Sequence, residues 1–451
     1  MKWESKNLTQ ASRMADGDLL VRTFFLTIFA VQFVMLYCLL NAKFKVLFFV
    51  VLALISVILL FRPKLSLYLS TFIAYSGIAA SMLQGLFLPA VALTTAGMII
   101  YFLDSKLVAL ASAPQNKIFL AWGCLMIMST LYAADLTLSY SNIYTFTKYL
   151  IFYFLIINIL DSWQSLRGML WLLSITGVVM SFYGIYVFIS SPVEAGIRLS
   201  SFVTDPNSFS MQLIPLVAFS YTLLKTEKRW SFKMSSFALL GFNVVAIILT
   251  FSRGGWLALL ATLFLIGWNE KTNKKFLFLM AAFFLVALFI IPTDLFLLRF
   301  GNVQSITMDA SVAQRLRLLK GSFQMFLDHF LTGVGIGNFI VYSKLYAKLN
   351  FPLVAHNAYL HVAAELGIAG LLLFISLLLM TLKSLRKSLS TLKNSYLSHF
   401  QHYPKGLMIA LAGFAINALT LSEHFSIVLF LIIAFTVTIR KLTLQLDARN
   451  D

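Results

Sequence analysis

One histidine lies where a polar segment meets a strongly apolar one. His356 opens the run A-H-N-A-Y-L-H-V-A-A-E-L-G-I-A-G, which covers residues 355–370 and follows a long polar stretch. An imidazole titrates near neutral pH, so it can take a proton from a hydroxyl group. The position and residue type therefore make His356 a candidate general base.

A single arginine interrupts a second apolar region. Arg253 lies in L-T-F-S-R-G-G-W-L-A-L-L, residues 249–260. An arginine at this depth costs a few kcal/mol unless it is paired or solvated, and its planar guanidinium suits bidentate contact with phosphate. Gly254 and Gly255 predict a tight turn with close backbone approach. An arginine at a hairpin tip that reaches the lipid headgroups explains the same pattern equally well.

A third segment, G-I-R-L-S-S-F-V-T-D-P-N-S-F-S-M-Q-L-I-P, covers residues 196–215. Its Asp-Pro-Asn run begins at Asp205 and predicts a turn followed by a helix, with Asn207 or Ser208 as the N-cap. The positive end of such a helix, with Arg198 upstream, would attract an anion such as phosphate. An ordinary capped helix beside a snorkelling arginine is the competing interpretation.

The longest polar segment contains Q-R-L-R-L-L-K-G-S-F-Q-M-F-L-D-H-F-L-T-G-V-G-I-G-N-F, beginning at Gln314. Three- and four-residue steps between apolar residues predict an amphipathic helix, with the stripe Leu316, Leu319, Phe323, Phe326 and Phe330. Arg315, Arg317 and Lys320 lie off this stripe, which predicts a helix on the membrane surface with its basic face toward headgroups or substrate. Residues 333–337 read as a flexible turn, without the strand that precedes a nucleotide-binding glycine motif.

The amino-acid composition indicates the class of protein in which these groups are positioned. The chain has 451 residues, 60% of them hydrophobic and 12% charged, with a mean hydropathy of +0.88, which indicates an integral membrane protein. The net charge of +18 is explained by lysines and arginines kept in cytoplasmic loops, so no nucleic-acid partner is implied. Cys38 and Cys124 lie in apolar runs and suggest neither a disulfide framework nor a metal site.

Apolar runs predict an all-α polytopic protein with 12–14 transmembrane helices and both ends on one side. The runs lie at 22–41, 43–61, 66–84, 86–103, 116–133, 145–160, 167–190, 209–225, 234–251, 255–269, 275–292, 357–380, 404–420 and 424–440. The predicted organisation is a cytoplasmic tail (1–20), a transmembrane helical region (21–292), a large periplasmic loop carrying amphipathic helices (293–356), C-terminal transmembrane helices (357–440) and a second cytoplasmic tail (441–451).

Charge orients this topology. Of the 35 lysines and arginines, 24 fall on the side of the two tails, which the positive-inside rule makes cytoplasmic. Arg198, Arg253, the loop of residues 293–356 and the pair Glu423-His424 then share the outer face. Four segments far apart in sequence thus supply polar groups to one side of the membrane.

The segment after His356 supplies supporting groups. Asn357 is placed to cap the following helix, with Tyr359 in its first turn. Glu365 lies well inside that helix, and His361, four residues earlier, is predicted to pair with it. Glu423 with its neighbouring histidine is either a supporting polar group or the polar end of a helix.

Together these segments resemble the O-antigen ligase and O-antigen polymerase superfamily of bacterial membrane glycosyltransferases. The resemblance is carried by R-L-S-S-F-V-T-D-P-N-S-F at Arg198, S-R-G-G-W-L-A-L at Arg253, R-L-x-L-L-K…H-F-L-T-G-V-G-I-G-N-F from Arg315, and the run at His356. It covers about residues 196–380, while the first 190 residues match only as generic spans. The chain has Phe330 where a proline often follows the histidine in this family.

The resemblance implies an inverting, metal-independent transferase of GT-C-like fold in the bacterial inner membrane, with its active face in the periplasm and no cofactor. The donor would be a glycan on undecaprenyl pyrophosphate. The acceptor would be the lipid A core in a ligase, or another lipid-linked glycan in an O-antigen or exopolysaccharide polymerase. Arg253 and Arg315 match arginines that hold the donor pyrophosphate, with assistance from Arg198, and His356 matches the proposed base.

Two further observations bear on the function. The outer-face acids Asp205, Asp294, Asp309 and Asp328 are scattered, so the sequence predicts no metal site. A transporter for an anionic solute would also gather arginines, but it usually shows paired half-repeats and broken helices, which the sequence does not reveal. A purely structural scaffold would leave Arg253 unexplained. Ligase and polymerase are not separated by residue chemistry.

Overall fold

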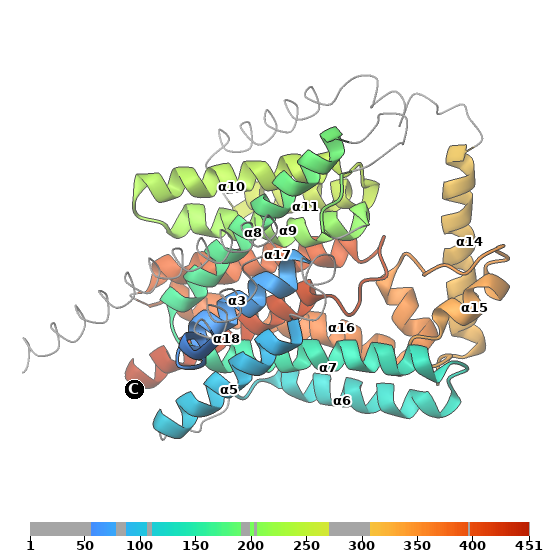
Figure 1. Ribbon diagram of the computed structural model, residues 1–451, viewed down its shortest axis with the longest axis horizontal. Helices are drawn as coiled ribbons and strands as arrows, with labels where there is room; N and C mark the ends of the chain where they lie inside the picture. Colours follow the sequence, from blue (N-terminus) through green and yellow to red (C-terminus); the bar gives the residue numbers. More distant parts are fainter. Residues whose placement is uncertain are drawn as a thin grey trace, which may run out of the picture.

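The structure is a computed structural model, and it describes residues 56–77, 87–105, 111–190, 199–202, 205–269, 307–395 and 397–450. All regular elements in these ranges are helices (Figure 1). Arg198 and the predicted spans at 22–41 and 275–292 lie outside the described residues. The predicted all-α class is thus confirmed for the part of the chain that is described.

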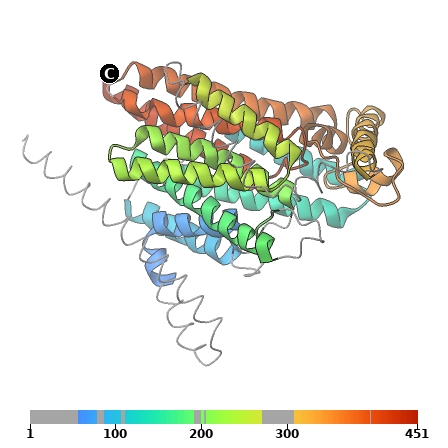
Figure 2. The same cartoon turned by 90° about the horizontal axis from the view of Figure 1, so that it is seen from above.

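Most helices lie side by side in one bundle (Figures 1 and 2). Its members are α3 (Pro63–Ser76), α5 (Phe87–Ser105), α6 (Pro114–Ser129), α7 (Leu136–Ile159), α8 (Trp163–Ser190), α9 (Pro206–Thr226), α10 (Trp230–Leu249), α11 (Arg253–Asn269), α16 (Ala358–Lys393), α17 (His402–Asn417) and α18 (Ile427–Asn450). Short 3-10 turns, η2 (Thr130–Tyr132) and η5 (Ser398–Gln401), follow α6 and precede α17. Two further helices, α14 (Thr307–Asp328) and α15 (Phe339–Tyr346), lie at one end of the bundle.

Five of the described helices are long and apolar enough to cross a membrane: α7, α8, α10, α16 and residues 427–445 of α18. This confirms a polytopic membrane protein, while the total of 12–14 spans stays a prediction. The span predicted at 145–160 in fact begins at Leu136. Asp135 caps this helix by accepting hydrogen bonds from the backbone N–H groups of Thr137 and Leu138, so the polar residues before 145 are helical too.

The two ends of the bundle differ. We call the end that carries α14, α15 and the α17–α18 connection (residues 418–426) the loop end (Figures 1 and 2). At the opposite end, Lys64 Nζ lies 2.8 Å from Asp161 Oδ1, and Lys441 Nζ donates to the carbonyl of Ile157 at 2.6 Å. The predicted outer-face segments that the structure describes lie at the loop end.

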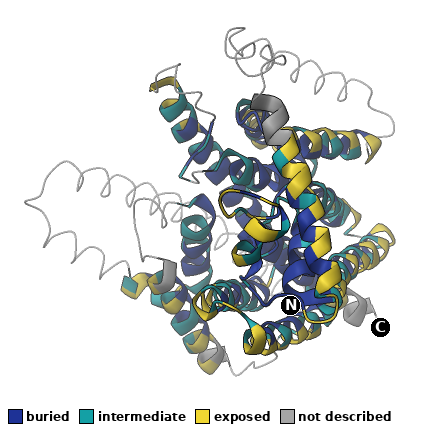
Figure 3. Cartoon of the chain, turned by 90° about the vertical axis from the view of Figure 1, so that its right-hand side faces the viewer, coloured by how far each residue is buried: buried dark blue, intermediate teal, exposed yellow. Residues whose placement is uncertain are grey.

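Helix α14 crosses the loop end at a steep inclination to the bundle helices (Figure 1). In Figure 3, which faces this end, exposed and buried residues alternate along the helix that crosses it. The predicted helix is confirmed, while its place on the membrane surface stays a prediction. Within the predicted apolar stripe, Phe326 is buried together with Leu318, Ser322 and Met325, whereas Leu316, Phe323 and Phe330 are exposed. Because apolar side chains occur on two sides of α14, spacing alone does not show which side packs on α15 and α16.

A break in α16 shapes the loop end. Gly367 has φ 63° and ψ −162°, outside the helical region. The carbonyls that the break frees accept hydrogen bonds from an adjoining loop: Val334 N–H donates to Ala364 O and Gly335 N–H to Glu365 O, each at 2.9 Å. A polar backbone inside a membrane protein must find such partners. The hydropathy of the sequence gives no sign of this break, because glycine is common within apolar runs.

The glycine segment of residues 333–337 is therefore not the flexible turn that its composition predicts. Gly333, Gly335 and Gly337 all have positive φ, and a Cβ at any of them would collide with neighbouring backbone. Ile336 N–H also donates to Ser129 Oγ at 3.1 Å, at the end of α6. The glycines are needed for close packing against α6, α7 and α16, and this packing holds the segment in place.

Candidate active site at the loop end

The connection of residues 418–426 is the point at which the candidate site residues meet. The first N–H of α16, from Ala358, donates to the carbonyl of Ala418 at 2.8 Å. The side chain of Asn357 donates to the next carbonyl, that of Leu419, at 3.2 Å. These two bonds place the start of α16, and His356 before it, directly against the connection.

Helix α9 reaches the same connection through its first turn. Ser208 Oγ lies 2.9 Å from Glu423 Oε1. The N-cap of α9 is Asp205, which accepts from Ser208 N–H at 2.9 Å, so the prediction of Asn207 or Ser208 as the cap is wrong. Pro206 explains the difference, because proline favours the first helical position and leaves the residue before it as the cap.

Helix α11 begins beside α9. Ser252 Oγ donates to Asn207 Oδ1 at 2.8 Å and accepts from Gly255 N–H at 3.2 Å. The predicted tight turn at Gly254 and Gly255 is wrong, since both residues are helical and the chain turns at Phe251, with φ 49°. The predicted close approach is present: a Cβ on Gly254 would collide with Thr420, in the connection.

Three helix N-termini thus face one region, those of α9, α11 and α16. Asn357 Oδ1 caps α16 by accepting from Leu360 N–H at 3.0 Å, as predicted. Each N-terminus carries a partial positive charge from its unpaired N–H groups. Arg253 is the first residue of α11, and its side chain is exposed at this end. The region therefore suits an anion such as a phosphate group.

His356 lies within electrostatic reach of both Arg315 and Asp205. Partial burial and then the positive charge of Arg315 hold the pKa of His356 below its usual value, against the opposing effect of Asp205. The ring is consequently neutral at pH 7 and able to accept a proton. His356 also has φ 51°, a left-handed conformation that costs about 1–2 kcal/mol in a non-glycine residue.

The other predicted site residues lie nearby in different roles. The side chain of Arg315 is exposed on α14, as are those of Arg317 and Lys320. Tyr359 donates its hydroxyl hydrogen to the carbonyl of Ala415 at 3.0 Å, so it fastens α16 to α17. The sequence predicts a supporting role for Tyr359 but no particular contact.

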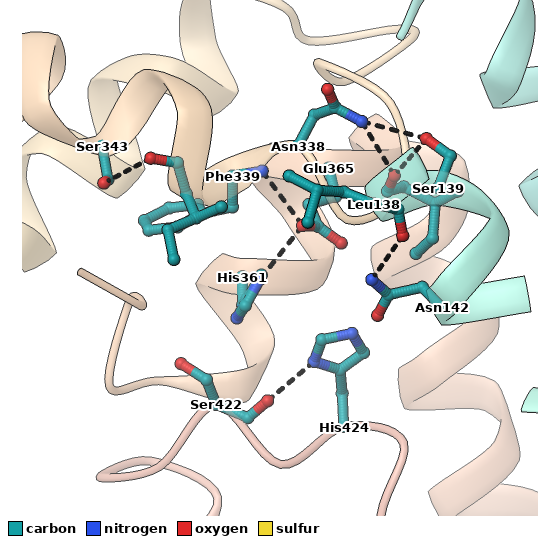
Figure 4. Close-up of polar contacts among 12 residues, drawn as sticks. Leu138, Ser139, Asn142, Asn338, Phe339, Ser343, His361, Glu365, Ser422 and His424 are labelled. Atoms are coloured by element: carbon teal, nitrogen blue, oxygen red, sulfur yellow. Dashed lines mark hydrogen bonds and ion pairs between the residues drawn. The ribbon is translucent and has the colours of Figure 1, made fainter. Parts of the chain in front are cut away.

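Glu365 lies at the centre of a buried polar cluster (Figure 4). Its Oε1 lies 3.1 Å from His361 Nε2, which confirms the predicted pairing, and it also accepts from the backbone N–H of Phe339 at 3.0 Å. The rings of His361 and His424 have centroids 4.7 Å apart. Burial, and then the neighbouring His361, lower the pKa of His424 to about 3, so its ring stays neutral.

This cluster joins elements that are distant in the chain. Glu365 belongs to α16, Phe339 begins α15, and His424 lies in the connection, where its Nδ1 is 2.9 Å from the carbonyl of Ser422. A buried, hydrogen-bonded carboxylate of this kind resists movement of the groups that it joins. Within the described residues, no set of three His, Cys, Asp or Glu side chains is arranged to hold a metal ion.

Comparison with known proteins bears on the same region. A family model described as O-antigen ligase matches residues 236–375. This region is similar to the O-antigen ligase family. No curated protein matches the chain significantly. The family match confirms the resemblance seen in the sequence, and it supports glycan transfer by a membrane protein as the general activity.

The O-antigen ligase region contains Arg253, Arg315, His356 and Glu365. Asp205 and Asn207 precede it in the sequence, yet the structure brings them to the same site through Ser252 and the connection. Ser208, Ser252 and Thr420 were not predicted to act together. Nothing in their local sequence indicates this, because small hydroxyl residues are common at any helix end.

Proposed function

We propose that this protein transfers a glycan from undecaprenyl pyrophosphate to a sugar hydroxyl at the loop end, on the periplasmic face of the inner membrane. The observation that carries the proposal is the state of His356. This histidine is held in a left-handed conformation, with a lowered pKa, beside Arg315 and the N-terminus of α16. Strained residues of this kind cluster at functional sites.

The proposed roles follow from where charge develops. As the bond between the sugar and the pyrophosphate breaks, negative charge builds on the departing pyrophosphate. Arg253, Arg315 and the N-termini of α9 and α11 stabilise that charge electrostatically, without a metal ion, and Arg198 assists. His356 takes the proton from the acceptor hydroxyl, which attacks the sugar from the face opposite the pyrophosphate and inverts its configuration.

The acceptor that we propose is the lipid A core, which makes the protein an O-antigen ligase. A polymerase that joins lipid-linked repeat units has the same chemistry and differs only in the acceptor. Helix α14 and the residues that follow it leave Leu316, Phe323 and Leu331 exposed at the loop end. Such a surface suits an acceptor that is itself anchored in lipid.

A transporter for an anionic solute is the alternative from another class, and one feature favours it. Helix α16 is broken at Gly367, and broken helices often line the substrate sites of transporters. In those proteins the freed backbone groups face the substrate. Here the carbonyls of Ala364 and Glu365 are bonded to residues 334 and 335 instead, which favours a structural role for the break.

Deleting the gene and examining both surface glycans and lipid-linked intermediates tests the proposal. A ligase is expected to leave the lipid A core without glycan while long lipid-linked chains persist. Accumulation of single repeat units would indicate the polymerase instead. Unchanged glycans with altered uptake of an anionic solute would contradict glycan transfer and favour the transporter.

A further inference from the structure

A cavity of about 240 Å³ opens beside the candidate active site, between α7, α9 and the start of α18. Its polar lining consists mainly of Tyr149, Asp205, Ser208, Gln212 and Glu423. A water molecule occupies about 30 Å³ in the liquid, so the cavity exceeds what one structural water needs. It extends from the cap of α9 to Gln212, a distance of roughly 10 Å along the helix.

One of the groups that line the cavity is a buried acceptor without a partner. The side-chain oxygen of Gln212 is buried and accepts no hydrogen bond. Buried polar groups are nearly always paired in folded proteins, so this oxygen indicates a missing partner. Tyr149, Asp205 and Glu423 line the same space.

The charges of the lining exclude pyrophosphate as that partner. Asp205 and Glu423 are acidic, and no lysine, arginine or histidine lines the cavity. A phosphate group would be repelled there, whereas Arg253 and Arg315 lie elsewhere at the loop end. The cavity therefore suits a ligand that is uncharged and carries several hydroxyl groups.

The hydroxyl, amide and carboxyl groups of the lining can together donate and accept hydrogen bonds. Ser208 Oγ lies 2.9 Å from Asp205 Oδ2 and 2.9 Å from Glu423 Oε1, yet a hydroxyl has only one hydrogen to donate. Burial and the nearby Asp205 raise the pKa of Glu423, which favours the protonated form of this carboxyl group over that of an exposed glutamate. Sugar hydroxyls also donate and accept, and Phe425 adds an apolar wall of the kind that packs against a sugar ring.

We propose that this cavity binds the sugar ring of the donor that is bonded to the pyrophosphate, with Tyr149, Gln212 and Glu423 contacting its hydroxyl groups. The assignment rests on the proposed function. The donor is preferred over the acceptor sugar because the cavity is walled by α7, α9 and α18, helices of the bundle, rather than by α14 and α15. Asp205 lines the cavity and also lies near His356, so a sugar there adjoins the reacting centre.

Binding to the purified full-length protein in detergent tests the assignment. One probe is the lipid-linked glycan extracted from cells that lack the gene, and the other is undecaprenyl pyrophosphate without a glycan. Wild-type protein is expected to bind the glycan-bearing lipid more tightly. Tyr149→Phe and Gln212→Leu should each weaken that binding about tenfold and leave binding of the sugar-free lipid unchanged.

Tyr153→Phe is the matched control, since Tyr153 lies one turn further along α7 and donates to Asn116 Oδ1 at 2.6 Å. It should change neither affinity. Equal weakening for both lipids, or no weakening, would overturn the sugar subsite. If Tyr149→Phe or Gln212→Leu raises the KM for the acceptor and leaves the KM for the donor unchanged, the cavity binds the acceptor sugar instead. If wild-type protein binds neither lipid, the proposed function itself fails.

Discussion

The two ends of the helix bundle treat polar groups in opposite ways. At the opposite end, Glu227 is buried and fully engaged: both of its oxygens accept from Arg167 at 2.6 Å, and Trp171 donates to Oε1 at 2.8 Å. At the loop end, Glu423 has one engaged oxygen, and the side-chain oxygen of Gln212 has no partner. Glu227 thus has partners for both of its oxygens, whereas Glu423 and Gln212 keep acceptor atoms open beside the candidate site.

Backbone conformation shows the same contrast. Within the described ranges, the non-glycine residues with positive φ are Phe251, Lys348 and His356, and all three lie at the loop end. Such conformations persist only where the surrounding contacts hold them. The difference teaches that backbone strain gathers at the end where chemistry is proposed, while the ion pairs of Lys64 and Arg167 lie at the other end.

The largest effect is expected from substitutions of His356, the proposed base at the loop end. His356→Ala should lower the transfer rate by about 10²–10⁴-fold, because the proposed base is lost. His356→Gly should be equally inactive but more stable by about 1 kcal/mol, since glycine adopts the left-handed conformation without strain. Transfer assays and thermal unfolding of both variants check this. Full activity in either variant would rule out His356 as the base.

Arg253→Lys should lower the transfer rate by about 10²–10³-fold, because lysine cannot make bidentate contact with the pyrophosphate. Assays with lipid-linked donor measure the effect. Arg229→Lys is the control, since Arg229 is exposed at the N-terminus of α10 and distant from the loop end. A similar loss in both variants would show that the effect is not specific to the site.

Glu227→Gln tests whether the opposite end of the bundle contributes to stability alone. It removes the charge that holds Arg167, so it should lower the free energy of unfolding by about 1–3 kcal/mol. The transfer rate of the folded protein should stay at the wild-type value. Thermal unfolding in detergent, followed by assays at a temperature where the variant is folded, separates the two quantities. A slower rate with unchanged stability would mean that the opposite end also takes part in catalysis.

The smallest expected effect concerns pH. The pKa of His356 is lowered from its usual value of about 6.5, so the ring becomes protonated only at a more acidic pH. The fall of kcat/KM on the acid side of the pH profile, the acid limb, should therefore lie below pH 6.5. Arg315→Gln removes a positive charge that contributes to the lowering, so the limb should move to higher pH. Rates measured across pH 4–8 (roughly the window in which histidine titrates) check the direction. A limb that stays in place would show that Arg315 does not act on His356.

Several features of the fold could be predicted because they depend on neighbours in the sequence. Asn357 caps α16 and His361 pairs with Glu365, as helix periodicity predicts. The existence of α14 follows from the same rules. The buried face of α14 could not be predicted in this way. Leu316 and Leu318 are equally apolar, and only the position of α15 and α16 determines that Leu318 is the buried one.

The cavity and the break in α16 could not be predicted, because each depends on residues that are distant in the chain. Tyr149, Gln212 and Glu423 lie in three separate segments, and the sequence does not indicate that they meet around one cavity. Gly367 is compatible with a continuous helix until residues 334 and 335 supply partners for the freed carbonyls. Hydropathy and spacing describe one segment at a time, so they miss features formed between segments.

The hydrogen bonds that close the break in α16 have a consequence for how this protein can diversify. Ile368 N–H donates to the carbonyl of Phe330 at 2.8 Å, so the segment that follows α14 is fastened to α16 at the break. Residues 331–357, which connect α14 to α16, are therefore held at both ends. Because Ala358 is separately bonded to Ala418, substitutions in residues 340–354 can reshape the surface offered to an acceptor while His356 keeps its place. Acceptor choice and reaction chemistry are thereby free to evolve independently.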